Sequence, residues 1–156
     1  MFFAAGTLFG ACDFTPTNTI TVPAGAIGQA VREGTFDFIV TGVDSSLTFG
    51  DRRAAGVYLI VSITVKNVGV EPEMFEWSAQ QLKDSIGRKY SASFMVPSLF
   101  GNVINAIDPG LEVPIKLAFD VPPGTKPTQI VLRESLSSDG ARVNLTQPPS
   151  LSRPRG

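Results

Sequence analysis

The chain has no histidine and only one cysteine, and these two absences exclude several kinds of site. Without histidine, neither a Ser-His-Asp nor a Cys-His catalytic arrangement can be assembled. One cysteine cannot form an internal disulfide, and without histidine it cannot complete a four-ligand zinc site. The fold must therefore be held together by burial of apolar groups, even in an oxidising compartment.

The chain also lacks a basic cluster. Its 13 Lys and Arg residues and 14 Asp and Glu residues are mixed along the sequence and give a net charge of −1. Proteins that bind nucleic acid usually carry a basic stripe that neutralises phosphates. We therefore expect no nucleic-acid partner, and no pattern indicates a cofactor. Glu71, Glu73 and Glu76 lack the spacing of a calcium loop, so we interpret them as a solvated acidic loop and predict no metal site.

The first twelve residues are uncharged and apolar and end at the only cysteine, Cys12. Small residues directly before a lone cysteine resemble the end of a bacterial lipoprotein signal, in which Cys12 would carry the lipid. The run is too short to span a bilayer. Two features depart from that pattern, because the first basic residue is Arg32 and Phe9 is bulkier than usual. The alternative is an ordinary N-terminal strand in which Cys12 is a small buried hydrophobe.

The length and composition indicate that the rest of the chain forms one domain. Hydrophobic residues make up 43%, and the 15 glycines and 12 prolines favour short strands joined by turns. After the signal-like segment 1–12, we predict a flexible tether over 13–30, because it is rich in Thr, Pro, Gly and Ala. The domain is predicted over 31–146 and a disordered tail over 147–156.

Alternation of apolar and polar residues predicts half-buried strands. The strongest case is 57–66, where β-branched residues dominate. Its predicted inward side chains are Val57, Leu59, Val61, Ile63 and Val65. Other strands are predicted at 35–41, 113–121, 128–133 and 141–146, with two more joined by a glycine turn over 81–90.

The segments between these strands are predicted to be loops or parts of the core. Residues 44–56 are predicted to be a loop. Trp77, the only tryptophan, shares its parity with Phe75 and Ala79 and is predicted to fill the middle of the core. Roughly seven strands with frequent turn signals predict an all-β fold, an immunoglobulin-like antiparallel β-sandwich.

Three groups of residues resemble the DUF4352 family. The pattern K-N-x-G-x-x-P, which follows a hydrophobic strand in that family, occurs at 66–72. The hairpin pattern L-x-D-x-x-G-x-x-Y occurs at 82–90, and a P-G pair at 109–110 precedes F-D-V-P at 119–122. The resemblance covers about 31–146, and it is the order and spacing of the three groups that make it specific.

The resemblance implies an immunoglobulin-like sandwich of the kind found on exported proteins and lipoproteins, chiefly of Gram-positive bacteria and mycobacteria. The mycobacterial secreted antigen of the MPT63 type has a similar fold. The resemblance supplies no catalytic residues. This chain departs from the family pattern in its missing basic leader and in the Arg52-Arg53 segment, which looks like a loop insertion.

One stretch, residues 91–107, contains no charged residue. One interpretation is a cover over an open end of the core. The other is a binding patch for a protein or an apolar ligand, because large exposed apolar surfaces usually mark interaction sites. The candidate anchors of this patch are Phe94, Met95, Leu99, Phe100, Val103 and Ile104.

These observations predict a non-enzymatic binding module that is held at the outer face of a bacterial membrane by lipid on Cys12. Its expected partner is a protein or an apolar ligand. The alternative is a freely secreted β-sandwich that binds a small apolar molecule or a metal ion. An enzyme would need a carboxylate or serine site that no pattern reveals.

Overall fold

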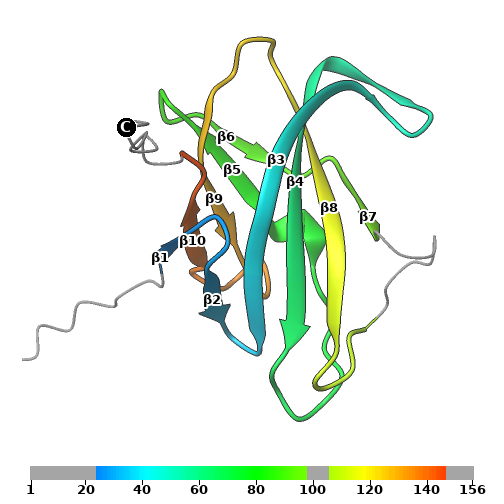
Figure 1. Cartoon of the computed structure of the whole chain (residues 1–156), viewed down its shortest axis with the longest axis vertical. Coiled ribbons are helices and arrows are strands. Elements are labelled where there is room, and N and C mark those ends of the chain that lie inside the picture. The colour runs from blue at the N-terminus through cyan, green and yellow to red at the C-terminus, as the bar shows by residue number, and fades with distance from the viewer. Residues whose placement is uncertain (1–23, 98–105, 147–156) are drawn as a thin grey trace, which may run out of the picture.

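The computed structural model describes residues 24–97 and 106–146, which form two β-sheets packed face to face (Figure 1). One sheet has the strand order β1-β10-β9-β5-β6, and the other has the order β2-β3-β4-β8-β7. The elements are β1 (Ala24–Ala26), β2 (Ala30–Glu33), β3 (Phe36–Phe49), β4 (Arg52–Asn67), the 3-10 turn η2 (Trp77–Ala79), β5 (Gln81–Asp84), β6 (Lys89–Ser91), β7 (Phe94–Pro97), β8 (Glu112–Val121), β9 (Pro127–Leu132) and β10 (Ala141–Asn144).

The predicted β-sandwich is confirmed. Neighbouring strands are antiparallel, except that β1 runs parallel to β10. The described ranges hold ten strands, more than the roughly seven expected of such a sandwich. The difference arises because β1, β2 and β7 are only three or four residues long and carry little periodicity.

The core lies between the two sheets and is built by the alternating residues that the sequence indicated. On β4, Leu59, Val61, Ile63 and Val65 are buried, and Val57 packs against the same cluster at its margin. The largest fully buried side chains come from both sheets, namely Phe36, Phe38, Phe119, Ile63, Leu82, Ile107, Ile115, Leu117, Ile130 and Leu132. Because every second side chain of a strand faces the same way, these residues meet in one layer.

The prediction for Trp77 was wrong. Phe75 is buried and contacts Phe36 and Phe38 with ring centroids 6.2 and 6.0 Å apart, so it holds the central aromatic position. Trp77 is only half-buried and packs on the margin of the core. The reason is local, because the backbone after Phe75 coils into η2, where alternation of sides no longer applies.

The predicted loop over 44–56 is instead a two-stranded ribbon. Strand β3 continues to Phe49 and β4 begins at Arg52, with Gly50 in the left-handed region at the turn. The pairing slips near Thr41 and near Leu47, where β-bulges bend the ribbon. The ribbon projects beyond the sandwich, so most of its side chains face solvent and it shows no apolar alternation (Figure 1).

The folded domain also begins earlier than predicted. Residues 24–30, expected to belong to the tether, contain β1 and the start of β2. Strand β1 joins the sheet through backbone pairing with β10, and its small side chains give no hydrophobic period. The remaining predicted tether, the signal-like segment with Cys12, and the predicted tail over 147–156 lie outside the described residues.

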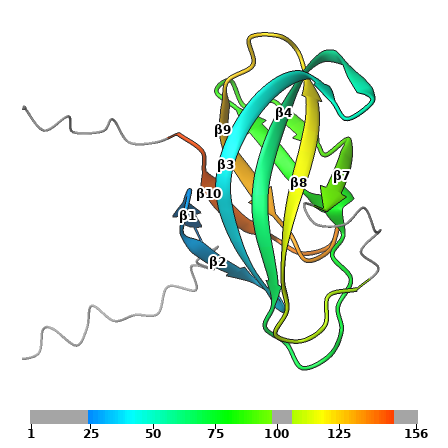
Figure 2. The ribbon, with the colours of Figure 1, turned by 45° about the vertical axis from the view of Figure 1, so that its right-hand side comes forward.

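The arrangement of the edges gives the domain two distinct sides. Strand β1 pairs with β10, so the described chain starts and ends at the same edge. Strand β7 and the projecting β3–β4 ribbon lie on the opposite side in both views (Figures 1 and 2). In residues 24–97 and 106–146, no helix is long and apolar enough to cross a membrane.

Candidate functional site

Polar side chains within the sequence motifs hold backbone segments together, and we call them structural fasteners, beginning with Asn67. Its Nδ2 donates to the carbonyl oxygens of Glu71 and Ile107, both at 2.7 Å, and its Oδ1 accepts from the Gly69 N–H at 2.8 Å. Asn67 is fully buried, so these bonds satisfy the polar atoms of its own amide, which water cannot reach. They fasten the loop after β4 to the segment before β8.

Gln80 and Asp84 fasten the other sheet in the same way. Gln80 donates to the carbonyl oxygens of Glu76 and Arg133 and accepts from the Arg133 N–H at 2.7 Å, which fixes η2 against the end of β9. The buried Asp84 carboxylate accepts from the Ile86 and Arg88 N–H groups, from Arg88 Nε at 2.6 Å and from the Tyr90 hydroxyl.

The pKa of Asp84 reflects this setting. Burial by itself raises the pKa, but hydrogen bonds from the Arg88 side chain, the Arg88 and Ile86 N–H groups and Tyr90 outweigh it, and the net pKa is lowered. The carboxylate therefore stays ionised at neutral pH. All of its partners belong to the β5–β6 hairpin, so Asp84 fixes the geometry of that hairpin.

Charges alternate across the outer face of the second sheet near one end. Register places Arg32 opposite Asp37, Asp37 opposite Lys66, and Lys66 opposite Glu112, on β2, β3, β4 and β8. Arg32 and Asp37 form a two-pronged ion pair with distances of 2.7 and 3.0 Å. Hydrogen bonds from Arg32 lower the pKa of Asp37. Opposite charges on facing positions favour this register over a slipped one.

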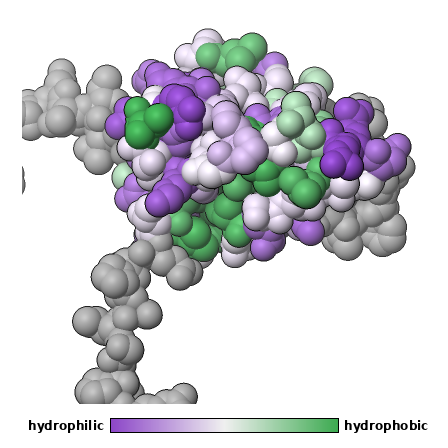
Figure 3. Space-filling view, turned by 90° about the horizontal axis from the view of Figure 1, so that it is seen from above, coloured by the Kyte–Doolittle hydropathy of each residue, from purple (hydrophilic) through white to green (hydrophobic). Residues whose placement is uncertain are grey.

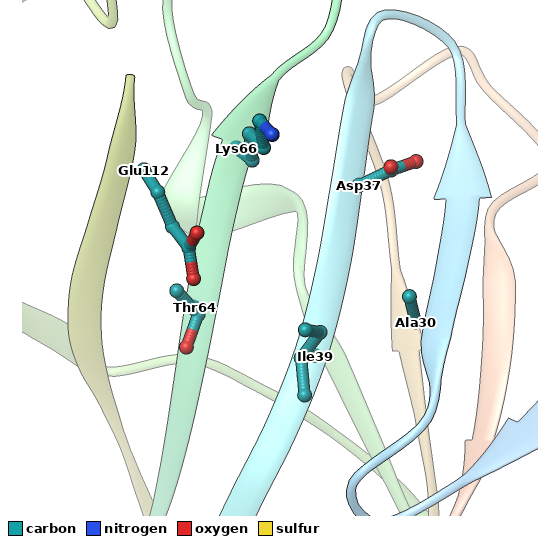
Figure 4. Close-up of a pocket in the computed structure, with 6 residues that line it drawn as sticks. All are labelled: Ala30, Asp37, Ile39, Thr64, Lys66 and Glu112. Carbon is teal, nitrogen blue, oxygen red and sulfur yellow. The ribbon is translucent and has the colours of Figure 1, made fainter. Parts of the chain in front are cut away.

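A shallow hollow lies on this charged row, lined by Ala30, Asp37, Ile39, Thr64, Lys66 and Glu112 (Figure 4). Its volume is about 220 Å³, which is smaller than the roughly 300–1,000 Å³ of typical small-molecule sites. Its carboxylates and its lysine alternate along the register, and Arg32 already engages Asp37. The row therefore serves to fix register and offers little room for a ligand.

The opposite end of the same outer face carries a second apolar cluster, which we call the outer aromatic cluster. It lies outside the core, and its members are Phe49, Ala54, Tyr58, Ile60, Phe94 and Ala118. The ring of Phe94 lies 5.4 Å from that of Phe49 and 5.3 Å from that of Tyr58, the latter in an edge-on arrangement. The Arg52 guanidinium lies 4.9 Å from the centre of the Phe94 ring, within the range of a cation–π contact.

Three segments distant in sequence build this cluster. Phe94 on β7 stands opposite Ala118 on β8, and the small alanine lets its ring reach Tyr58 on β4. Ala118 is 0% exposed, and Tyr58 and Ile60 are 5% and 7% exposed, although all three face away from the core. The sequence signal was the unbroken apolar run 57–61, because a strand covered on both faces shows no alternation.

The structure divides the predicted apolar patch. Phe94 points outward into the outer aromatic cluster, whereas Met95 points inward and packs against the core. The other four predicted anchors, Leu99, Phe100, Val103 and Ile104, lie outside the described residues. Phe49, Arg52, Tyr58 and Ile60 were not predicted, because their approach to Phe94 depends on the strand register.

One large hydrophobic side chain is exposed at this end of the molecule. Leu47, on the β3–β4 ribbon next to Phe49, is 61% exposed. The view from above shows hydrophobic residues gathered along one side among hydrophilic neighbours (Figure 3). In the part of the chain that the structure describes, no three Cys, His, Asp or Glu side chains gather closely enough to hold a metal ion. The outer aromatic cluster with Arg52 is therefore the strongest candidate surface.

Two solved structures share the architecture. A secreted protein from Mycobacterium tuberculosis, MPT63, is 18% identical, covers 80% of this chain and 98% of its own, and superposes with a TM-score of 0.64. An uncharacterized β-sandwich protein from Clostridium difficile 630 is 16% identical, covers 81% and 94%, and has a TM-score of 0.54. At these identities the likeness concerns the fold. No curated protein matches the sequence.

The family model for the domain of unknown function DUF4352 matches residues 25–143. Its start agrees with the fold, in which β1 already belongs to the sheet. The match includes all three motif segments, and Asn67 and Asp84 within them are the fasteners described above. The chain belongs to the DUF4352 family.

Proposed function

We propose that this protein is an exported, non-enzymatic binding domain, attached to the outer face of a bacterial membrane through lipid on Cys12, and that it binds a protein partner with the outer aromatic cluster. The observation that carries the proposal is the cluster itself. Three aromatic rings and an arginine gather outside the core, on a sheet face whose other end is charged. Aromatic residues and arginine are the types that dominate the energetic centres of protein interfaces.

The absence of an evident reaction centre supports a binding role. The sequence has no histidine. The buried polar side chains Asn67, Gln80 and Asp84 are all engaged in hydrogen bonds that hold the fold. Phe94, which the sequence nominated as a patch anchor, belongs to the cluster. Leu99, Phe100, Val103 and Ile104 follow it in the same uncharged stretch of the sequence.

Export is supported by the apolar segment that ends at Cys12 and by one structural neighbour, which is described as secreted. The eleven residues between Cys12 and Ala24 can span at most about 40 Å. With the lipid on Cys12, the tether would join the domain at the side where β1 pairs with β10. The outer aromatic cluster and the ribbon lie on the opposite side of the domain, where a partner has access.

The binding surface is tested by photo-crosslinking on intact cells. A photoreactive side chain replaces Leu47 beside the cluster, and a matched control replaces Ile86, which is 73% exposed on the β5–β6 turn of the other sheet. We expect covalent protein adducts from the Leu47 position and none from the Ile86 position. Equal adducts from both positions, or no adduct from Leu47, would contradict a protein partner at this surface. The second result would favour the alternative, a small apolar ligand.

The anchor is tested separately by metabolic labelling with a fatty acid. We expect label on the wild-type protein and none on the Cys12→Ala variant, which should appear in the medium. Label on neither protein, with both in the medium, would instead support a freely secreted domain.

A further inference from the structure

One sheet edge of this domain is uncharged and lies beside the outer aromatic cluster. The edge strands are β1 and β6 in one sheet and β2 and β7 in the other. Strand β2 carries Arg32 and Glu33, β6 begins with Lys89, and β1 is only three residues long. Charges and short length normally keep a foreign strand from adding to an edge. Strand β7 has four residues and no charge. Because the Ala118 carbonyl faces β7 and Ala118 pairs with Phe94, the N–H groups of Phe94 and Val96 point toward β8, and the N–H of Met95 and the carbonyl groups of Met95 and Pro97 point to the free edge.

The side chain beside this edge points to the charge of a partner. Arg52 lies over Phe94, the first residue of β7. Within residues 24–97 and 106–146, the ion pairs are Arg32–Asp37 and Arg88–Asp84, so Arg52 has no carboxylate partner there. A guanidinium that stacks on an aromatic ring still presents N–H groups at its rim, and their geometry fits a carboxylate.

We infer that β7 and Arg52 together accept an extended, acidic segment of a partner protein. The segment adds as a further strand to the free edge of β7, its apolar side chains contact the outer aromatic cluster, and a carboxylate pairs with Arg52. Strand addition supplies affinity through backbone hydrogen bonds, while side-chain contacts select the sequence. The inference rests on the proposed function and names the chemistry of its partner.

The ribbon provides a matched pair of variants for the test. Arg52 and Arg53 are neighbours on β4 and are both exposed. Successive residues of a strand face opposite sides, so only Arg52 is placed over Phe94. Arg52→Gln and Arg53→Gln therefore remove the same charge from the same ribbon, but from opposite sides of it.

The probe is a library of random peptides displayed on phage, selected against the full chain carrying Cys12→Ser. We expect the selected peptides to alternate apolar residues and to contain Asp or Glu. Their affinity should fall about tenfold for Arg52→Gln and stay unchanged for Arg53→Gln, as expected for loss of one charge-assisted pair. Selected peptides without acidic residues, or equal binding to both variants, would overturn the inference.

Hydrogen exchange then locates the bound peptide. We expect the amide of Met95, whose N–H faces the free edge, to become protected on binding, while those of β6, the edge of the other sheet, stay unchanged. Protection that leaves β7 unchanged, or no protection at all, would refute strand addition. If crosslinking at Leu47 succeeds while the acidic preference or the β7 protection fails, the inference falls and the proposed function stands. If crosslinking fails as well, both are wrong.

Discussion

Removing the side-chain amide of Asn67 should be one of the most damaging changes outside the hydrophobic core. Asn67 is fully buried at the end of β4, and its amide joins the backbone at Gly69, Glu71 and Ile107. In the Asn67→Ala variant, the Gly69 N–H and the Glu71 carbonyl lose these bonds. The Ile107 carbonyl keeps its bond from the Glu73 N–H at 3.1 Å. The change therefore removes three hydrogen bonds, one of them buried and two partly buried.

The magnitude follows from the three hydrogen bonds of this amide. A typical intramolecular hydrogen bond contributes about 1 kcal/mol net. We therefore expect the free energy of unfolding to fall by about 3 kcal/mol. For a domain of this size that corresponds to a decrease in Tm of roughly 12 °C.

Urea unfolding followed by Trp77 fluorescence measures this change, because the chain has a single tryptophan and its side chain is half-buried in the native state. The control is Asn144→Ala, since Asn144 is exposed on β10, and we expect it to change stability by less than about 0.5 kcal/mol. A loss below about 1 kcal/mol in Asn67→Ala would refute the fastener role, because simple hydrogen-bond removal would already exceed it.

Three further changes test other parts of the structure by the same unfolding assay. Because the pKa of Asp84 is lowered on folding, its contribution to stability is complete above the ordinary carboxyl pKa and is lost as pH falls through the lower folded-state value. The Asp84→Asn variant should therefore be less stable than the wild type at pH 7 and should lose less stability when the pH is lowered. A variant whose stability falls with pH as the wild type's does would contradict this. Gly56→Ala would place a Cβ 2.1 Å from a β8 carbonyl oxygen and should lower the free energy of unfolding by about 1–3 kcal/mol. The control Gly42→Ala meets no atom within 4 Å and should change stability little. Equal effects of the two substitutions would be evidence against the close approach at Gly56. Ala118→Leu would place a larger side chain at the position beneath the Phe94 ring and should lower the free energy of unfolding by about 1–3 kcal/mol through overpacking. An unchanged stability would mean that the ring does not lie over Ala118 in solution.

The parts of the fold that the sequence predicted correctly are those with one buried face. In β4 and β8 each second residue enters the core, so the pattern alone assigns the strand and its inward face. The β3–β4 ribbon escaped prediction because it projects beyond the core and hydrogen bonds, rather than burial, hold it together. Strand β1 escaped for a related reason, since its Ala and Gly residues join the sheet through backbone pairing with β10.

Only part of the candidate surface was accessible to the same reasoning. Phe94 was identified because its segment lacks charge, but its neighbours depend on register. The pairing of Phe94 with Ala118 joins residues far apart in the chain, and a slip of one position would turn Phe94 toward the core. The cation–π contact between Arg52 and Phe94 also requires that the ribbon bend toward β7. The bulges near Thr41 and Leu47 favour this bend.

The outer aromatic cluster also joins the two segments of the second sheet that have the least support from the core. Strand β7 is a four-residue edge strand, and the ribbon extends past the sandwich, so neither is held by a full layer of buried side chains. Phe94, Phe49 and Arg52 connect them. Segments with little burial open more readily than the core strands, and binding surfaces are drawn from them. A strand added to β7 would hold Phe94 in place and stabilise its contacts with Arg52 and Tyr58. Binding at this edge should therefore slow hydrogen exchange along the ribbon as well as along β7, whereas a ligand that contacted the ribbon alone would leave β7 unprotected.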